Sequence, residues 1–340
     1  MSAVDESLAI AARHLASARR VLLASHRRPD GDGTGSMAAL ALLLRRAGAH
    51  ATIYAPDLVP RRYKWVPAAK TALQRLPGDV AFDVTVVVDC ADLELLGDSL
   101  PPPPRLGLMI SLDHHASGKP FGDVAVCDPS VAACAVLVAR IAKLNAWPLD
   151  PPIATALYVS LISDTGGFRH ANTNVEALTL AAELVAAGAE PHAIAQRLEE
   201  RSTPGKLRLI GLALATLELA CDGKVAMLTV TGEMVAASGG TWDDSEGLVY
   251  WARGVEGVQV GVVLTTARGG GVRASMRARG ERVDAGAVCL SLGGGGHPGA
   301  AGVHLDTDLA TARARVLEAL AAALAEPAPA APAPAAPAAS

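Results

Sequence analysis

Aromatic residues are scarce in this 340-residue chain, because phenylalanine, tyrosine and tryptophan together make up only 3% of it. Long single-stranded nucleic acids are held by rows of stacking aromatic rings, so this scarcity argues against that class of partner. Excess positive charge is also missing, since the formal net charge is −4. The chain therefore lacks the global basic surface of a general nucleic-acid-binding protein, although a local basic patch stays compatible with its composition.

Paired cysteines and long apolar runs are missing as well. The five cysteines show no C-x-x-C spacing, which favours reduced thiols in a cytoplasmic protein. The first 20 residues alternate charged and apolar side chains like an amphipathic helix, and they do not resemble a signal peptide. No uncharged apolar run reaches the ~18 residues of a membrane span. We therefore expect a cytoplasmic protein without a membrane partner.

Apolar strand patterns alternate with helical patterns over the first half of the chain. Strands are expected at 21–25, 51–55, 84–90 and 106–113, and helices at 35–48, 129–145 and 151–163. This alternation predicts an α/β fold, with a parallel sheet covered by helices on both faces. Ligands bind beyond the carboxyl ends of such strands, and polar residues follow three of them.

A more polar stretch, 189–207, is expected to link residues 1–188 to a smaller α/β domain at 208–325, which would bind substrate across a cleft. The expected elements of this second domain are a helix near 205–221, strands near 224–231, 257–266 and 271–278, a glycine-rich loop at 293–299 and a helix near 308–325. Residues 326–340 are mostly alanine and proline, and they cannot bury enough surface to offset the entropy of ordering. We expect this tail to be disordered.

The first polar stretch is SHRRPDGDGTGS, residues 25–36, which carries His26, Asp30 and Asp32. Its interleaved glycines would let a loop turn tightly, so that both carboxylates point inward. The run 33–36 then opens a helix, whose free N–H groups favour a phosphate. The alternative is a capped, solvated loop in which the aspartates only stabilise turns.

Three further polar positions end predicted apolar elements. Asp89 directly follows a strand, and the alternative to a ligand role is a cap for the next segment. The triplet 113–115 is Asp-His-His, and here the alternative is a surface loop that happens to contain histidines. Asp164 ends an apolar helix, where a carboxylate is unfavourable toward the helix dipole unless a positive charge lies close.

A cluster of four carboxylates needs compensating positive charge. Two unit charges about 4 Å apart repel by ~4 kcal/mol at an effective dielectric constant of about 20. Two divalent cations would remove this repulsion. Mixed carboxylate and imidazole ligands favour Mn²⁺, with Mg²⁺, Co²⁺ or Zn²⁺ as alternatives, and paired metals are a known device for hydrolysing phosphate esters.

The order His-x₃-Asp-x-Asp, Asp, Asp-His-His, Asp resembles the DHH phosphoesterase superfamily over nearly the whole chain, the tail excepted. The resemblance implies that the ligands of the first metal are His26, Asp30 and Asp89. It implies that those of the second are Asp32, Asp89, His114 and Asp164, so that Asp89 bridges the two ions. It further implies that Asp113 orients a histidine of its triplet and that His115 contacts the scissile phosphate. A purely structural imidazole is the alternative for His115.

The stretch GGGGHPGAAG, residues 293–302, exposes successive backbone N–H groups that suit an anion. Together with GVRASMRARG, 271–280, it resembles the DHH-associated C-terminal domain, which binds nucleotides. The resemblance and the position of one arginine after Asp164 suggest these substrate contacts: Arg169, Ser275, Arg277, Gly294, Gly295, Gly296 and His297. Arg277 would grip a phosphate, with His297 beside it. We expect strand alternation to place Ser275 and Arg277 on opposite sides of the strand.

The local basic patch of the second domain consists of five arginines opposed by one acid, Glu281. Its arginines are Arg268, Arg273, Arg277, Arg279 and Arg282. For those other than Arg277, a solvated strand face is the favoured interpretation. A patch that reads a terminal phosphate would select short substrates by length and not by sequence.

Within the superfamily, the second domain argues against family II pyrophosphatases, and the chain is short for a RecJ-type exonuclease. The remaining group is the bifunctional oligoribonucleases, or nanoRNases, which also remove the 3′-phosphate of 3′-phosphoadenosine 5′-phosphate. The resemblance thus implies hydrolysis of very short RNA to mononucleotides, and it makes a homodimer plausible. A phosphodiesterase for cyclic di-AMP or linear dinucleotides is one alternative, and a nucleotide sensor without catalysis is another.

Overall fold

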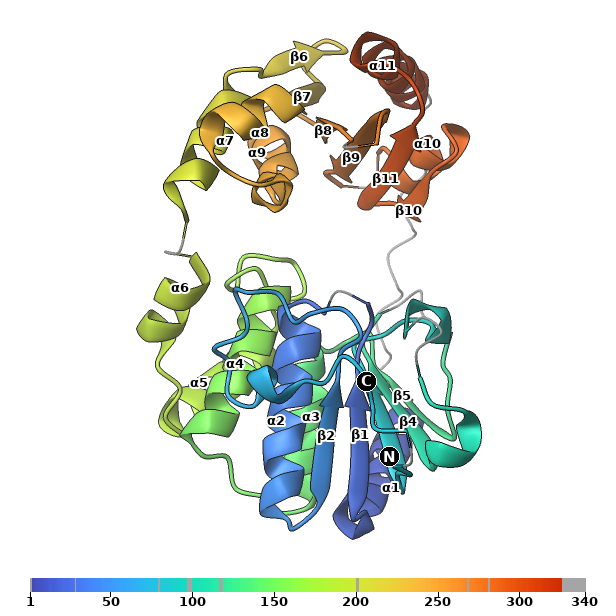
Figure 1. The fold of residues 1–340 in the computed structure, drawn as a ribbon, viewed down its shortest axis with the longest axis vertical. Coiled ribbons are helices and arrows are strands. Elements are labelled where there is room, and N and C mark those ends of the chain that lie inside the picture. Colours follow the sequence, from blue (N-terminus) through green and yellow to red (C-terminus); the bar gives the residue numbers. More distant parts are fainter. Residues whose placement is uncertain are drawn as a thin grey trace, which may run out of the picture. The chain divides into compact units, whose positions relative to one another are not determined.

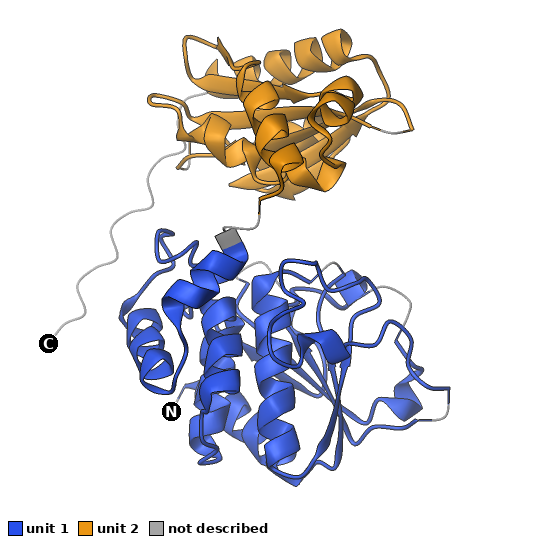
Figure 2. Ribbon diagram, turned by 60° about the vertical axis from the view of Figure 1, so that its left-hand side comes forward, with its two compact units in different colours: residues 1–201 blue, residues 202–340 orange. Residues whose placement is uncertain are grey.

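The computed structural model of this protein describes residues 2–27, 29–78, 80–96, 100–115, 119–199, 202–267, 269–280 and 282–325. The chain divides into two compact units, residues 1–201 and 202–340 (Figure 2). The division falls within 189–207, the stretch that we interpreted as a connection. That stretch carries helix α6 (Pro191–Glu199) and the start of α7 (Pro204–Leu214). The tail predicted to be disordered lies outside the described residues.

A five-stranded parallel sheet organises the first unit, in the order β2-β1-β3-β4-β5 (Figure 1). Its strands are β1 (Arg20–Ala24), β2 (His50–Tyr54), β3 (Val84–Val88), β4 (Leu108–Asp113) and β5 (Val124–Cys127). The predicted α/β class and parallel sheet are confirmed, and four of these strands were expected from continuous apolar runs. Strand β5 was not predicted; it has four residues and pairs only with β4 among the described strands.

The two faces of this sheet are covered differently. The α-helices of the unit before α6 are α1 (Ala3–Ser17), α2 (Gly31–Arg46), α3 (Cys134–Leu144), α4 (Pro151–Asp164) and α5 (Val175–Ala186). Val21 and Leu23 point into the large core that these helices share. Leu22 and Ala24 point into a smaller cluster on the other face. That face is covered by loops and by the short 3₁₀ helices η2 (Leu93–Leu96) and η3 (Pro103–Arg105), whereas we expected α-helices on both faces. A third 3₁₀ helix, η1 (Ala69–Thr71), follows β2.

Helix α2 begins four residues earlier than its sequence predicts. The side chain of Asp30 caps it by accepting hydrogen bonds from the backbone N–H groups of Asp32 and Gly33. The glycine-rich stretch is therefore the first turn of a helix and not a loop. Its glycines permit close packing on α4, since a Cβ at Gly35 would lie 2.5 Å from the carbonyl oxygen of Ala156. Asp32 is consequently placed inside the first turn of α2.

The second unit has a mixed six-stranded sheet in the order β10-β11-β9-β8-β7-β6. Its strands are β6 (Glu218–Ala220), β7 (Val225–Val230), β8 (Val260–Thr266), β9 (Val272–Ala278), β10 (Gly295–His297) and β11 (Ala300–Leu305). Its other elements are α7, α8 (Gly232–Ser238), η4 (Trp242–Ser245), α9 (Leu248–Gly254), α10 (Ala285–Ser291) and α11 (Leu309–Ala325). One face packs against α10 and α11, and the other packs against α7, α8 and α9.

Two sequence predictions in this unit are wrong in detail. The helix expected near 205–221 ends at Leu214 and is followed by β6. The glycine-rich loop expected at 293–299 contains β10, which pairs with β11. Among the described residues, no helix combines the length and the apolar character needed to cross a bilayer.

Candidate active site

The carboxyl ends of β1, β3 and β4 bring the predicted metal ligands together, as expected for a parallel sheet. His26 follows β1, Asp89 directly follows β3, and His114 directly follows β4. The start of α2 and the end of α4 add three carboxylates, those of Asp30, Asp32 and Asp164. Segments that are far apart in the sequence thus converge on one edge of the sheet.

Asp89 lies at the centre of this arrangement. Its Oδ2 atom is 3.6 Å from Nε2 of His26, and its Oδ1 atom is 3.8 Å from Nε2 of His114. The residue is 3% exposed, and its backbone has the left-handed φ of 54°, which is strained for an aspartate. A hydrogen bond from its N–H to the carbonyl oxygen of Leu112 holds it there. The two oxygens of one carboxylate therefore face two different histidines.

The first ligand group consists of His26, Asp30 and Asp89, each with one ligand atom within 4.8 Å of the others. Nδ1 of His26 lies 2.8 Å from the carbonyl oxygen of Arg27, which leaves Nε2 to the carboxylates. Oδ1 of Asp30 accepts the capping bonds of α2 and lies 4.0 Å from Nε2 of His26. This set of oxygens and one imidazole fits a divalent cation.

The second ligand group consists of Asp32, Asp89, His114 and Cys134, again within 4.8 Å of one another. Nε2 of His114 lies 3.5 Å from Oδ2 of Asp32 and 2.9 Å from Oδ2 of Asp164. This nitrogen is buried and has no partner of good hydrogen-bond geometry among the described residues. A buried imidazole nitrogen that faces carboxylates on three sides fits a second cation.

Cys134 is the member of the site that sequence reasoning missed. It begins α3 and is fully buried, and its backbone N–H donates to Oδ2 of Asp32 at 2.8 Å. Oδ1 of Asp32 accepts from the hydroxyl groups of Ser36 and Ser160. The surrounding sequence, SVAACAV, carries no spacing signal, so only the fold reveals this neighbour.

The pKa values of two histidines and two aspartates of the site are raised, which shows that its clustered carboxylates favour bound positive charge. Burial lowers the pKa of His26, but the Asp89 carboxylate outweighs burial and raises it to about 9. Burial likewise opposes charge on His114, yet the neighbouring carboxylates raise its pKa to about 10. Burial raises the pKa of Asp89 to about 6 and that of Asp32 well above its usual range. Protons thus take the place that cations would fill.

Asp113 and His115 form a third contact at the same edge. Nδ1 of His115 lies 2.8 Å from Oδ1 of Asp113 and 3.8 Å from Oδ1 of Asp89. The hydrogen bond to Asp113 raises the pKa of His115, although burial opposes this. The His115 side chain is 41% exposed, so its Nε2 is the ring nitrogen left for a ligand. Asp113 is buried and acts as the support of the imidazole.

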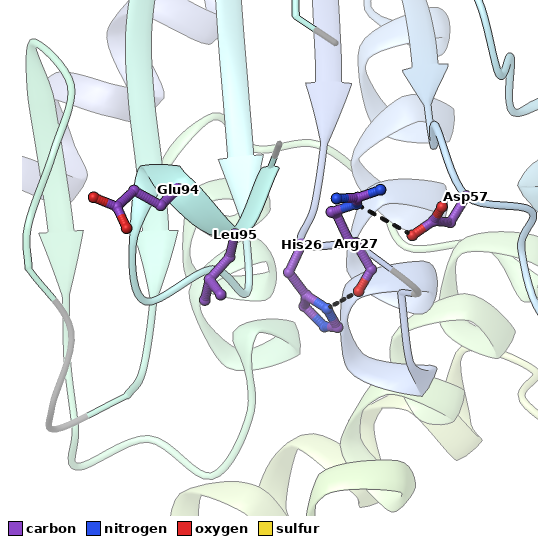
Figure 3. Close-up of a pocket in the computed structure, with 5 residues that line it drawn as sticks. All are labelled: His26, Arg27, Asp57, Glu94 and Leu95. Carbon is purple, nitrogen blue, oxygen red and sulfur yellow. Dashed lines mark hydrogen bonds and ion pairs between the residues drawn. The ribbon is translucent and has the colours of Figure 1, made fainter. Parts of the chain in front are cut away.

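A pocket of about 510 Å³ opens beside His26. Figure 3 shows His26, Arg27 and Asp57 on one side of it and Glu94 and Leu95 on the other. Nε of Arg27 lies 3.7 Å from Oδ2 of Asp57, and the N–H of Arg27 donates to the carbonyl oxygen of Leu95. The pocket offers room for a substrate group next to the first ligand group.

The predicted substrate contacts of the second unit lie on β9 and β10. Ser275 and Arg277 share one face of β9, opposite the buried Ala274 and Met276, so the expectation of opposite sides is wrong. Residues two apart in a strand point to the same side. Arg277 pairs in register with Ala300, which pairs with His297. Arg277 and His297 therefore lie in one row across three strands.

Close packing on β11 requires glycine at position 296 in β10 and at position 294 just before it. A Cβ at Gly294 would lie 2.4 Å from the carbonyl oxygen of Gly302, and one at Gly296, with φ of 143°, would lie 2.5 Å from Cα of Ala301. Gly295 lies between them and is exposed.

Arg169 is exposed in the turn after α4, where its Nε donates to the carbonyl oxygen of Gly166. Arg268 and Glu281 of the predicted basic patch lie outside the described residues.

Comparisons with known proteins agree with this architecture. The model of the DHH family N-terminal domain matches residues 20–161, and that of the DHHA1 domain matches residues 222–326. The chain is 36% identical over 304 residues to the bifunctional oligoribonuclease and PAP phosphatase NrnA of Thermus thermophilus, covering 88% of this chain and 89% of that one. The chain belongs to the DHH phosphoesterase family. The family assignment and the acidic cluster indicate a metal-dependent phosphoesterase.

Two further relatives of this DHH phosphoesterase extend the comparison. It is 23% identical over 289 residues to the bifunctional oligoribonuclease and PAP phosphatase NrnA of Bacillus subtilis, covering 84% of this chain and 89% of that one. The crystal structure of an exopolyphosphatase-related protein from Bacteroides fragilis has a TM-score of 0.88 at 23% identity, covering 96% of this chain and all of that one. The structural likeness establishes the fold.

Proposed function

We propose that this DHH phosphoesterase hydrolyses very short oligoribonucleotides to mononucleotides and removes the 3′-phosphate of 3′-phosphoadenosine 5′-phosphate. The observation that carries the proposal is the position of Asp89, whose two oxygens face His26 and His114 separately. Its support from outside the structure is the 36% identity to the Thermus relative of that name. Substrates as short as these match a chain with few aromatic residues.

The proposed cofactor is a pair of divalent cations, with Mn²⁺ favoured. One ion would be held by His26, Asp30 and Asp89, and the other by Asp32, Asp89, His114 and Asp164. Bound there, the cations supply Lewis-acid activation of the phosphate ester. The mixed oxygen and imidazole donors support Mn²⁺ over Mg²⁺, which prefers oxygen ligands.

His115 is proposed to act on the substrate directly. Asp113 accepts from Nδ1 of His115 and thereby keeps the ring protonated and oriented. The free Nε2–H then donates to a non-bridging oxygen of the scissile phosphate and stabilises charge that develops there. In the second unit, Arg277 and His297 are proposed to bind a phosphate of the substrate. Ser275 is proposed to contribute from a parallel row, in which it pairs with Gly302 and Gly302 pairs with Gly295.

The proposed location is the cytoplasm, and the proposed assembly is a homodimer. All five cysteines lie in the described residues and are free thiols, which supports a reducing compartment. The homodimer rests on the family resemblance alone. Sedimentation equilibrium of the purified chain tests it by measuring the mass in solution.

One assay tests the proposed reaction. Protein stripped with a chelator is given Mn²⁺ and, in parallel, di- to pentaribonucleotides, 3′-phosphoadenosine 5′-phosphate and cyclic di-AMP. We expect mononucleotides from the oligomers and adenosine 5′-phosphate from the phosphorylated nucleotide, with no turnover before Mn²⁺ is added. Exclusive cleavage of cyclic di-AMP would replace the proposal by the dinucleotide alternative. Nucleotide binding without any turnover would leave only a sensor.

A further inference from the structure

Two exposed aromatic residues follow each other in the sequence of helix α9 in the second unit. Tyr250 and Trp251 on α9 are 47% and 60% exposed, and they are the only aromatic residues among the exposed large hydrophobic side chains of the described residues. Aromatic residues are otherwise scarce in this chain and contribute to cores. Two consecutive exposed aromatic residues leave apolar surface in contact with water, and such surface is typical of a site that binds a ligand or partner.

A pocket of about 370 Å³ lies against these rings, lined by Tyr250, Trp251, Gly254 and Val255. Residues four apart on a helix share a side, so Tyr250 stands above Gly254, the last residue of α9, and Val255 directly follows the helix. A Cβ at Gly254 would meet no heavy atom within 4 Å. The missing side chain of Gly254 thus keeps the pocket open, and the space is at the small end of the range for ligand sites.

Positive charge flanks the Tyr250 ring. The guanidinium carbon of Arg253 lies 5.2 Å from the ring centroid, and that of Arg277 lies 5.5 Å from it. Nε of Arg277 is also 3.5 Å from the hydroxyl oxygen of Tyr250. Neither guanidinium is paired with a carboxylate within the described part of the chain. This charge suits an anionic ligand with a flat ring.

The rings lie on the same side of the sheet as the predicted phosphate contacts. Gly261 pairs with Arg277, and a Cβ at Gly261 would lie 2.3 Å from the backbone nitrogen of Arg253. Helix α9 therefore rests on the face toward which Arg277 points. Arg277 is followed across the sheet by Ala300 on β11 and His297 on β10. Because the side chain of Ala300 is small, it leaves space beside Arg277.

We propose that Tyr250 and Trp251 form a stacking platform for the base of a nucleotide whose phosphate is bound by Arg277. The proposal rests on the proposed function and adds the group that binds the base. Base stacking on aromatic rings tolerates any base, so the platform would accept short RNA of any sequence. A second copy of this chain is the competing occupant, but the guanidinium groups of Arg253 and Arg277 beside the Tyr250 ring favour an anionic nucleotide.

The test compares a nucleotide with its base-free counterpart. Adenosine 5′-phosphate and ribose 5-phosphate are titrated by calorimetry into the full-length chain with saturating Mn²⁺. We expect Trp251→Ala to weaken the binding of the nucleotide about tenfold or more while the Kd of ribose 5-phosphate stays within about twofold. Trp251→Phe should retain most of the affinity. Gly254→Leu should fill the pocket and reproduce the loss, and it keeps the helix intact.

The controls separate the possible outcomes. Leu219→Ala, which removes an exposed side chain from β6 of the same unit, should change neither Kd. Unchanged nucleotide affinity in both Trp251→Ala and Gly254→Leu would overturn the proposal, as would an equal loss for the two ligands. A lower sedimentation mass of Trp251→Ala with unchanged nucleotide affinity would assign the rings to a copy interface instead. Failure of the wild type to hydrolyse RNA would refute the proposed function, but the comparison of the Kd values of adenosine 5′-phosphate and ribose 5-phosphate would still test the stacking platform.

Discussion

Nε2 of His114 lies 2.9 Å from Oδ2 of Asp164, which brings the end of β4 and the end of α4 together at one point. The carboxylate at the helix end, which is unfavourable toward the helix dipole, thereby gains a positive neighbour whenever the imidazole is protonated. Asp32 approaches the same nitrogen at 3.5 Å. Protonation of His114 and binding of a cation are therefore competing ways of neutralising the same charges.

Mn²⁺ binding should strengthen as the pH rises toward 9. In the metal-free protein the pKa values of His26 and His114 are raised to about 9 and about 10, so both rings are protonated at neutral pH. A cation must displace these protons, and each displaced proton strengthens binding up to about tenfold for each unit of pH. Calorimetric titration at pH 6.5, 7.5 and 8.5 should show a falling Kd and release of protons into the buffer. A Kd independent of pH would contradict the assigned ligands.

Asp89→Asn should abolish turnover and reduce the bound metal below two ions per chain. The substitution keeps the shape but removes the charge that both ligand groups share. The loss in kcat/KM should exceed the about 10–100-fold typical when a residue that only supports a ligand is removed. Asp92→Asn is the matched control, because Asp92 lies three residues on and outside both groups. Normal activity and normal metal content in Asp89→Asn would remove the basis of the proposed site.

Asp113→Asn should lower kcat/KM by about 10–100-fold while the metal content is retained. Asp113 acts through His115, whose pKa it raises by a hydrogen bond of 2.8 Å. The neutral amide of asparagine loses that effect, so the basic limb of the pH–rate profile should move to lower pH. A uniform loss of rate without any movement of the profile would instead indicate a structural role.

Arg277→Ala should mainly raise KM, by about 10–100-fold, because a charge-assisted contact to phosphate contributes about 1.5–3 kcal/mol. Arg273→Ala is the control, since Arg273 lies four residues earlier on the same face of β9. The measurement is steady-state hydrolysis of a dinucleotide with Mn²⁺. A fall in kcat at constant KM would make Arg277 a group that acts in the transition state.

Gly35→Ala should destabilise the first unit, because the added Cβ would lie 2.5 Å from the carbonyl oxygen of Ala156 on α4. Overpacking of this kind costs about 1–3 kcal/mol. Gly211→Ala in α7 meets no atom within 4 Å and should stabilise its helix by about 0.5–1 kcal/mol. Thermal unfolding of both variants measures the contrast. Equal melting temperatures would show that α2 and α4 can separate without loss.

The first unit was predictable to the extent that local pattern decides structure. Continuous apolar runs located β1 to β4, and the polar residues after them located the site, because parallel strands end at one edge. The start of α2 was missed because Asp30, a predicted metal ligand, also serves as the helix cap. Cys134 was missed because it reaches the site through tertiary packing, which leaves no mark on neighbouring residues.

The second unit was less predictable because its elements are short. Helices α8, α9 and α10 span seven residues each, too few to show a clear period of 3.6. The glycine run predicts a loop because glycine is depleted in strands, yet close packing on β11 requires glycine at positions 294 and 296. The predicted face of Ser275 is wrong although β9 is regular, because residues two apart in a strand share a face.

The left-handed backbone conformation of Asp89 in the active site lowers the stability of the folded protein. Glycine adopts that conformation without steric strain, whereas a non-glycine residue there typically reduces the free energy of unfolding by about 1–3 kcal/mol. A lineage released from the need for turnover would therefore gain heat resistance by exchanging this aspartate for glycine. At position 89, thermal stability therefore favours glycine, whereas catalysis requires aspartate.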